Sequence, residues 1–200
     1  MDLLRDALTL AAHAPSGGNL QPWRIHVLSD DALARFRAHM RERFAQPEPD
    51  VVEYDIYPPH LFEPYRTQRF RCGEMLYAAL AIERADKPAR LGQFAKNYDF
   101  FGAPTGLFCF VDRRLGPPQW SDLGMYLQTL MLLLEERGIA TCAQEAWSTY
   151  GATVQKFLNA PAELMLFCGM SIGYADEAAS VNSCRTERAA LDEFAVFHSG

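Results

Sequence analysis

A short polar loop near the start of the chain is the first segment whose residues could bind a ligand. Residues 13–27 read HAPSGGNLQPWRIHV, in which Ser16 and Asn19 offer side-chain hydrogen bonds. Gly17 and Gly18 lack side chains, so a ligand could approach the backbone N–H groups closely. Such a loop suits a flat or anionic ligand. The alternative is a helix C-cap followed by a tight turn, which composition alone favours.

Two later segments could contribute to a polar site. Arg185 and Arg188 stand three residues apart in NSCRTER, so in extended or helical backbone they could converge on a phosphate. Residues 138–147, GIATCAQEAW, are predicted as a turn of polar and small residues that follows an apolar helix. Two surface arginines are more often part of a solvated face, and that alternative stays open on these residues alone.

Several other chemistries lack their sequence motifs. The chain has no GxSxG, HExxH, GxxxxGK[ST] or GxGxxG. His13 lies near Ser16, but no third residue is placed by its spacing to orient the imidazole. The five cysteines are scattered and form no CxxC pair, and the five histidines are dispersed. We therefore predict reduced cysteines that pack as small hydrophobic residues, and no metal site.

Length and composition predict one globular domain, residues 1–200, because 49% of the residues are hydrophobic. The net charge of −6 argues against a nucleic-acid or acidic-membrane partner. The first residues show no signal-peptide pattern, and the apolar run 123–134 is too short to span a bilayer and contains Gln128. We expect a cytoplasmic protein.

Hydrophobic periodicity indicates an α+β sandwich, with a small central sheet covered by helices. The predicted helices cover 2–13, 29–43, 66–83, 86–97, 122–137 and 149–159, and the predicted strands cover 23–28, 107–111 and 164–172. The helix through 123–134 is apolar nearly all round, so we expect it to be buried on every side, which suggests a subunit interface. Residues 46–65 contain five prolines and predict an irregular loop: a lid, an interface arm or a solvated insertion.

The order of these segments resembles the nitroreductase family of FMN-dependent oxidoreductases. AAHAPSGGNLQPWR resembles the flavin-contacting loop of that family. Four further stretches follow in the family's order: NYDFFGAPTGLF (97–108), DLGMYLQTLMLLLEERGIATCAQ (122–144), LFCGMSIGYAD (166–176) and RTERAALDEF (185–194). The similarity covers nearly the whole chain and is closest to the branch of nitrobenzoate reductases, in which GYAD followed by TER is typical.

The resemblance implies an α+β fold with a mostly antiparallel sheet and an intertwined homodimer, with two FMN sites at the subunit interface. One subunit would hold the flavin through a loop that matches Pro15, Ser16, Gly17 and Asn19 of this chain.

The resemblance assigns the remaining flavin contacts to three other places. The partner subunit would supply the turn that matches Ala143, Glu145 and Ala146, whose backbone N–H groups face the reactive edge of the flavin. Asn97 lies in the region where a side-chain amide often meets the pyrimidine end. Arg188, with Arg185 as helper, matches the C-terminal basic position for the FMN phosphate.

The start of the sequence departs from the family pattern. Family members normally begin with a further segment, whose Arg-x-Ser-x-Arg element grips the phosphate and ribityl chain, whereas Met1 starts directly on the following helix. We expect either a start site assigned too late or a variant with weaker FMN binding, since each charge-assisted contact is worth roughly 1.5–3 kcal/mol. The family also favours Pro and Gly at the positions of Ala143 and Ala146.

The resemblance implies a ping-pong oxidoreductase, in which hydride passes from NAD(P)H to flavin N5 and then to a nitroaromatic or similar acceptor. Nearby N–H donors would stabilise the reduced flavin, so no catalytic side chain is expected. The alternative is a dimer that binds flavin or another planar ligand without catalysis. Residues 54–65 and the pair Phe100 and Phe101 are candidates for shaping the acceptor pocket, with core packing as the alternative for the pair.

Overall fold

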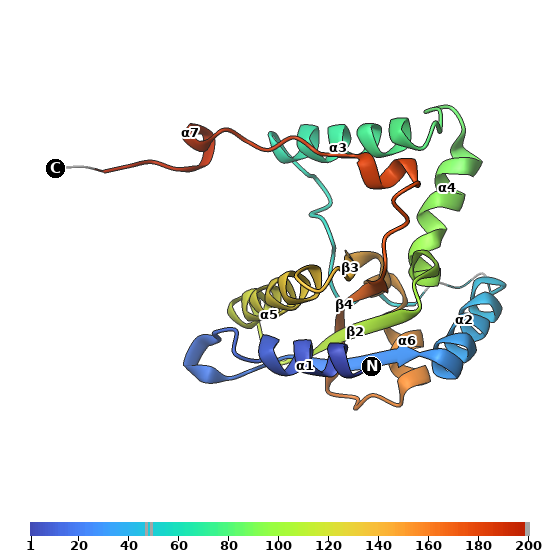
Figure 1. Ribbon diagram of the computed structural model, residues 1–200, viewed down its shortest axis with the longest axis vertical. Helices are drawn as coiled ribbons and strands as arrows, with labels where there is room; N and C mark the ends of the chain where they lie inside the picture. The colour runs from blue at the N-terminus through green and yellow to red at the C-terminus, as the bar shows by residue number, and fades with distance from the viewer. Residues whose placement is uncertain (47, 49, 199–200) are drawn as a thin grey trace. The chain divides into compact units, whose positions relative to one another are not determined.

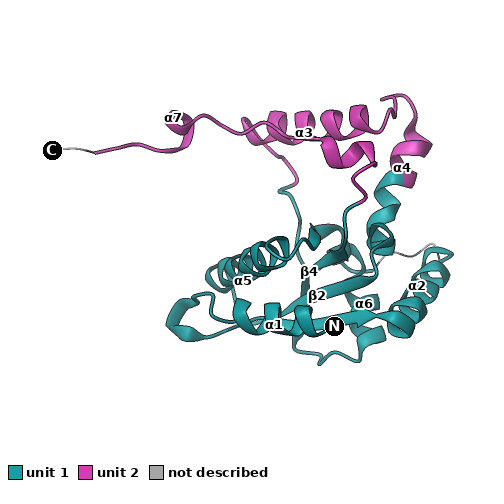
Figure 2. Ribbon diagram, in the orientation of Figure 1, with its two compact units in different colours: residues 1–58, 93–175 teal, residues 59–92, 176–200 magenta. Residues whose placement is uncertain are grey.

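A computed structural model describes residues 1–46, 48 and 50–198 (Figure 1). The described chain divides into two compact units (Figure 2). Unit 1 comprises residues 1–58 and 93–175, and unit 2 comprises residues 59–92 and 176–200.

Unit 1 contains the sheet and most of the helices. Its strands are β1 (Arg24–Ser29), β2 (Thr105–Asp112), β3 (Ala140–Gln144) and β4 (Leu164–Gly173). Its α-helices are α1 (Asp2–Ala11), α2 (Asp30–Phe44), α5 (Pro117–Glu135) and α6 (Gly151–Leu158). Three short 3₁₀ segments complete it: η1 (Gly17–Asn19), η2 (Lys96–Gly102) and η3 (Glu145–Tyr150).

The sheet is antiparallel throughout, in the order β1-β2-β4-β3. The register shifts between Cys109 and Phe110 of β2, which leaves Phe167 of β4 as the extra residue of a bulge. The small antiparallel sheet between helices confirms the predicted α+β sandwich.

Two apolar layers cover the two faces of this sheet (Figure 1). On one face, α1 and α5 pack against alternate residues of β2 and β4, including Leu107, Cys109 and Met170. On the other face, α2, α6, η2 and η3 pack against Phe108 and Phe110. The alternation of side chains along a strand assigns each residue to one layer or the other.

Two aromatic rings of the second layer lie directly on the sheet backbone. A Cβ atom added at Gly106 would stand 2.5 Å from the Phe100 ring, and one added at Gly169 would stand 2.2 Å from Cδ1 of Trp147. The two rings also pack together, with their centroids 4.8 Å apart. Because only glycine leaves room for such contacts, Gly106 and Gly169 determine where η2 and η3 meet the sheet.

The segment that follows α2 is attached to unit 1 by polar contacts. Asp50 pairs with Arg43 at 3.1 Å and accepts the backbone N–H of Thr153 at 2.7 Å, in the first turn of α6. Further along the chain, the Tyr54 hydroxyl donates to the carbonyl of the bulge residue Phe167. Between α2 and α3 (Tyr65–Ala79), none of the described residues lies in a helix or strand.

Unit 2 is built mainly from α3, the first part of α4 (Lys87–Ala95), the 3₁₀ segment η4 (Ser180–Ser183) and the short α7 (Leu191–Phe194). Inside this unit Arg90 pairs with Glu74 at 2.9 Å, and its guanidinium lies 4.1 Å from the centre of the Tyr77 ring. No residue of α3 is fully buried in the single chain.

Two sequence-based expectations need correction. The predicted turn within 138–147 contains strand β3, and the predicted helix 122–137 begins earlier, at Pro117, since proline suits the first helical turn. In the single chain that helix exposes Met125 (39%) and Leu132 (61%), so its burial on every side by a subunit interface stays a prediction. Of the phenylalanine pair, Phe100 is a core residue, whereas Phe101 is 43% exposed.

We predict that Gly169→Ala lowers the free energy of unfolding by about 1–3 kcal/mol, the usual cost of overpacking, because its methyl group would overlap Trp147. Urea denaturation followed by tryptophan fluorescence measures the change. Gly73→Ala is the control, because the added methyl group meets no atom within 4 Å in the middle of α3. A Gly169→Ala variant as stable as the wild type would contradict this packing.

Candidate functional site

The loop that follows α1 adopts backbone conformations that side chains seldom occupy. Gly18 and Asn19 have φ values of 56° and 57°, and Gln21 has a φ of 49°. The Ser16 hydroxyl accepts the Gln21 N–H at 3.0 Å, which closes the turn. Left-handed residues other than glycine cost energy and are common at functional sites. The loop is a tight turn after α1, as the alternative interpretation expects, and it is strained, with Asn19 exposed at its surface.

One buried carboxylate holds this loop to unit 1. Both carboxylate oxygens of Asp122, which is 4% exposed, lie 3.3 Å from the backbone nitrogen of Gly17. Asp122 belongs to α5, and η1 packs against that helix. Pro15 and Gly17 are exposed, and Ser16 is half-buried. The loop predicted to hold the flavin is therefore fixed to α5 at Gly17.

The second predicted segment lies at an edge of the sheet. β3 pairs only with β4, so one side of its backbone is free of the ladder. Ala143 is exposed near the end of β3, and η3 begins at Glu145. The first N–H groups of a helical segment have no partner within it, and in η3 these include the N–H groups of Glu145, which is exposed, and Ala146, which is buried in the single chain.

Asn97 is joined to this second segment. The Gln144 amide Nε2 donates to the Asn97 backbone carbonyl at 2.8 Å and lies 3.3 Å from Asn97 Oδ1. The structure therefore brings Asn97 together with Ala143, Glu145 and Ala146, all within unit 1.

The two predicted phosphate ligands lie in unit 2. Arg185 and Arg188 are exposed, and each donates to backbone carbonyls of its own segment, such as those of Asn182 and Glu187.

Sequence reasoning missed Gln144 and Asp122, which hold the predicted segments in place. Each side chain is at least 96% buried, and each is hydrogen-bonded, as buried polar side chains nearly always are. Each has a second polar residue beside it in the sequence, Ser121 before Asp122 and Glu145 after Gln144, so no local pattern marked either one as buried.

The ionisable groups along the sheet are shifted toward their neutral forms. Burial raises the pKa of Cys168 to about 12 and raises that of Cys109, its partner across the strands, well above the usual value. Burial also raises the pKa of the Tyr54 hydroxyl. Both thiols and the phenol are thus uncharged near neutral pH, so none of them supplies a nucleophile or a base.

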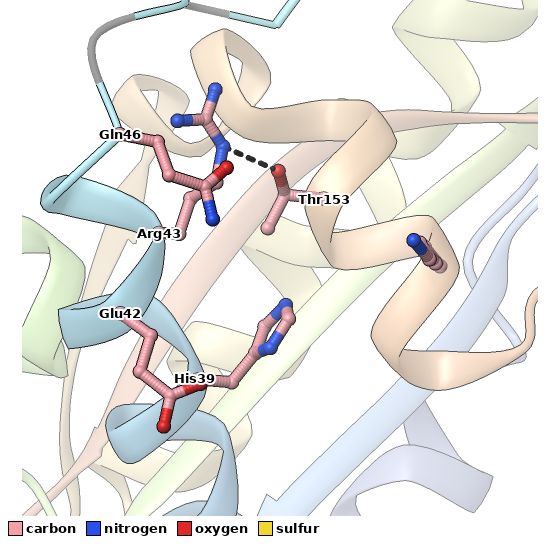
Figure 3. A pocket seen from close by; sticks show the side chains of 6 residues that line it. His39, Glu42, Arg43, Gln46 and Thr153 are labelled. Carbon is pink, nitrogen blue, oxygen red and sulfur yellow. Dashed lines mark hydrogen bonds between the residues drawn. The ribbon is translucent and has the colours of Figure 1, made fainter.

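A polar pocket of about 210 Å³ opens between α2 and α6 (Figure 3). In it Nε of Arg43 donates to Oγ1 of Thr153 at 3.2 Å, and the same guanidinium pairs with Asp50. Because Asp50 neutralises Arg43, we assign this pocket no ligand. Its lining residues are His39, Glu42, Arg43, Gln46, Thr153 and Lys156.

Comparison with known proteins identifies the family. A sequence model described as "Nitroreductase family" matches residues 1–174. The chain belongs to the nitroreductase family. It is 36% identical over 195 residues to a 4-nitrobenzoate reductase of Pseudomonas putida, a match that covers 98% of this chain and 85% of that protein. It is 35% identical over 198 residues to a nitrobenzene nitroreductase of Ectopseudomonas oleovorans, with coverages of 98% and 87%.

Solved nitroreductase structures share its fold. The FMN- and NADPH-dependent nitroreductase NfnB from Sphigopyxis sp. strain HMH superposes with a TM-score of 0.95 at 44% identity, over 100% of this chain and 90% of that chain. The FMN-dependent nitroreductase NfnB from Mycobacterium smegmatis, solved in complex with NADPH, gives a TM-score of 0.92 at 35% identity, over 99% and 88%.

The site residues have the chemistry that FMN needs. Flavin binding uses N–H donors at the edge of a flat ring, and the start of η3 and the Asn97 amide are such donors. On the strained loop, the exposed Asn19 and the half-buried Ser16 add polar side chains at a second place in the proposed site. The residues present therefore fit this cofactor.

Among residues 1–46, 48 and 50–198, no group of three or more His, Cys, Asp or Glu side chains is placed to hold a metal ion. None of the helices described there has the length and hydropathy that a membrane crossing requires.

We predict that Asp122→Ala loosens the loop at Gly17, because its N–H would lose a carboxylate acceptor worth about 1.5–3 kcal/mol. Amide hydrogen exchange should become faster at residues 17–21 and stay unchanged in β2. Asp122→Asn retains an acceptor oxygen and should restore most of the protection. Unchanged exchange in Asp122→Ala would show that the loop is held by other contacts.

Proposed function

We propose that this chain is an FMN-dependent nitroreductase, which reduces a nitroaromatic or similar acceptor with NADPH or NADH. The observation that carries the proposal is the 44% identity over the whole chain to an FMN- and NADPH-dependent nitroreductase of the same fold. The relatives named for nitrobenzoate and nitrobenzene point to a small aromatic acceptor. None of the named relatives favours the non-catalytic alternative. The cytoplasmic location stays a prediction.

Each predicted segment has a distinct task in this proposal. Pro15, Ser16, Gly17 and Asn19 line one side of the flavin, where the strained turn exposes backbone and small polar groups. The N–H groups of Glu145 and Ala146 donate to the ring from the other segment. Arg188 binds the phosphate with Arg185 as helper, since guanidinium groups pair with phosphate through two parallel hydrogen bonds.

The hydride chemistry belongs to the cofactor, because FMN supplies reversible two-electron transfer when bound. The protein positions the donor and the acceptor against the same ring and provides N–H groups where negative charge collects on reduction. We assign no catalytic side chain to the site, so the acceptor takes its protons from water.

We further propose that the site is completed in a homodimer. On α5, Met125, Gln128 and Leu132 follow the spacing of one helix face and are exposed in the single chain. In unit 2, several apolar residues near the C-terminus are also exposed: Leu191, Phe194, Val196 and Phe197. Exposed apolar residues of this size and number are typical of a subunit interface.

The function is tested on the purified protein. We expect a yellow protein with flavin absorption bands, which oxidises NADPH or NADH in the presence of a nitroaromatic acid such as 4-nitrobenzoate. A protein that stays colourless after FMN is added would contradict the proposal. A yellow protein that oxidises neither nicotinamide with any acceptor of a nitroaromatic and quinone panel would favour the non-catalytic alternative.

The dimer is tested with Leu132→Asp, which places a charge on the exposed face of α5. We expect light scattering after size exclusion to give the mass of a dimer for the wild type and a shift toward 22.5 kDa for the variant. Val51→Asp is the control, because Val51 is an 85% exposed apolar residue that lies outside the helices. A Leu132→Asp protein that stays dimeric would exclude this face from the interface.

A further inference from the structure

Gln144 is a buried amide that connects three parts of unit 1. It ends β3 and is 2% exposed. Its Nε2 donates to the Asn97 carbonyl of η2 at 2.8 Å, and its Oε1 accepts Nε1–H of Trp147 in η3 at 3.4 Å. Both polar atoms of the amide are therefore hydrogen-bonded, Nε2 to a residue earlier in the chain and Oε1 to a residue later in the chain.

A buried amide of this kind favours one arrangement of the segments that it connects, here β3, η2 and η3. If the residue were apolar, the Trp147 N–H and the Asn97 carbonyl would each lose a partner, and an unsatisfied buried polar group costs about 1–3 kcal/mol. Trp147 cannot move away to compensate, because its ring lies on the backbone at Gly169. Gln144 therefore contributes to the spacing of η2 and η3, together with the Phe100–Trp147 ring contact and the Tyr98 hydroxyl, which lies 3.0 Å from Oγ1 of Thr149.

The same contact orients the Asn97 side chain. Asn97 Nδ2 donates to the Phe94 carbonyl at 2.8 Å, while Oδ1 lies 3.3 Å from Nε2 of Gln144. The half-buried amide is held at both of its atoms and keeps one N–H and one lone pair for a ligand.

Gln144 also restrains the backbone on either side of it. It lies directly between Ala143 and Glu145, whose segment carries the proposed N–H donors. A donor that is oriented before the ligand binds costs no reorganisation when charge develops on that ligand.

We propose that Gln144 is a positioning residue for the flavin. It sets the placement of the Asn97 amide relative to the N–H groups of Glu145 and Ala146, and through them it favours the reduced over the oxidised state of bound FMN. The inference rests on the proposed function. Reduced flavin carries negative charge near N1 and O2, so oriented donors stabilise it more than they stabilise the oxidised form.

The test compares two glutamine substitutions of the same kind. Gln144→Met keeps the side-chain length and removes both hydrogen bonds of the amide. Gln155→Met is the matched control, because the Gln155 amide also donates to two carbonyls, those of Pro161 and Leu164, but belongs to α6 and contacts none of the proposed flavin residues through these hydrogen bonds. Each purified holoenzyme is measured for thermal unfolding, dissociation constant of oxidised FMN and midpoint potential.

We expect both variants to lose stability, but only Gln144→Met to change the midpoint potential of the bound flavin. Its affinity for reduced FMN should fall about tenfold more than its affinity for oxidised FMN, which makes the two-electron midpoint potential about 30 mV more negative. Gln155→Met should keep the wild-type potential.

Asn97→Ala keeps the backbone acceptor and gives a second test should Gln144→Met not fold. It should shift the potential in the same direction.

Three results would overturn the inference. A folded Gln144→Met enzyme with the wild-type potential would do so, and so would an equal shift in Gln155→Met, which would mark a general effect of stability. If Gln144→Met does not fold, a wild-type midpoint potential in Asn97→Ala would overturn the inference. A wild-type protein that binds no FMN would instead refute the proposed function, and this inference with it.

Discussion

The packing of two aromatic rings on glycine backbone is the contact on which the rest of unit 1 depends. Phe100 lies on Gly106 of β2, and Trp147 lies on Gly169 of β4. Neither ring could approach the sheet so closely if these strand positions carried side chains. These contacts fix how closely η2, which carries Asn97, and η3, which carries residues 145–146, pack on the neighbouring strands β2 and β4. The backbone at Phe100 and Phe101 accepts two left-handed residues in succession, and the ring packing offsets that strain.

The proposed site is built from irregular segments that polar contacts attach to regular ones. η1 is held by Asp122 of α5, and η2 is held to β3 by Gln144. Short 3₁₀ segments have too few internal hydrogen bonds to be rigid by themselves. The Asp122 carboxylate at η1 and the Gln144 amide at η2 are buried, so the low polarity around each makes alternative arrangements costly, and at η2 the amide adds to the ring packing. The site therefore combines exposed backbone, which a ligand can reach, with buried anchors that keep the backbone in place.

The sequence predicted the regular elements well and the anchors poorly, for a physical reason. Helices and strands with a long apolar face, such as those around residues 107–111 and 164–172, reveal themselves by local pattern. β3 has only five residues, small and polar ones among them, and its sequence pattern predicts a turn. It is the edge strand of the sheet, so its residues need not show the apolar pattern of a buried strand. The partner of Gln144 lies 47 residues away in the chain, and that of Asp122 lies 105 residues away. Contacts at such separations leave no periodic trace in one sequence. The order of the family segments predicted which loops belong to the site, but not what fixes them.

The helix α5 links the loop, the core and the proposed subunit contact. Its inner face buries Leu123, Leu130 and Leu134 against the sheet, and Asp122 on the same side holds Gly17. Its outer face carries Met125 and Leu132, whose exposure contradicts a helix enclosed by its own chain. A helix is stiff over the 19 residues of α5. A partner subunit that packs on the outer face therefore also restricts the position of Asp122 on the inner face. In the proposed dimer the flavin loop and the subunit contact therefore share one rigid element. The position of that loop then depends on assembly as well as on the fold of the single chain.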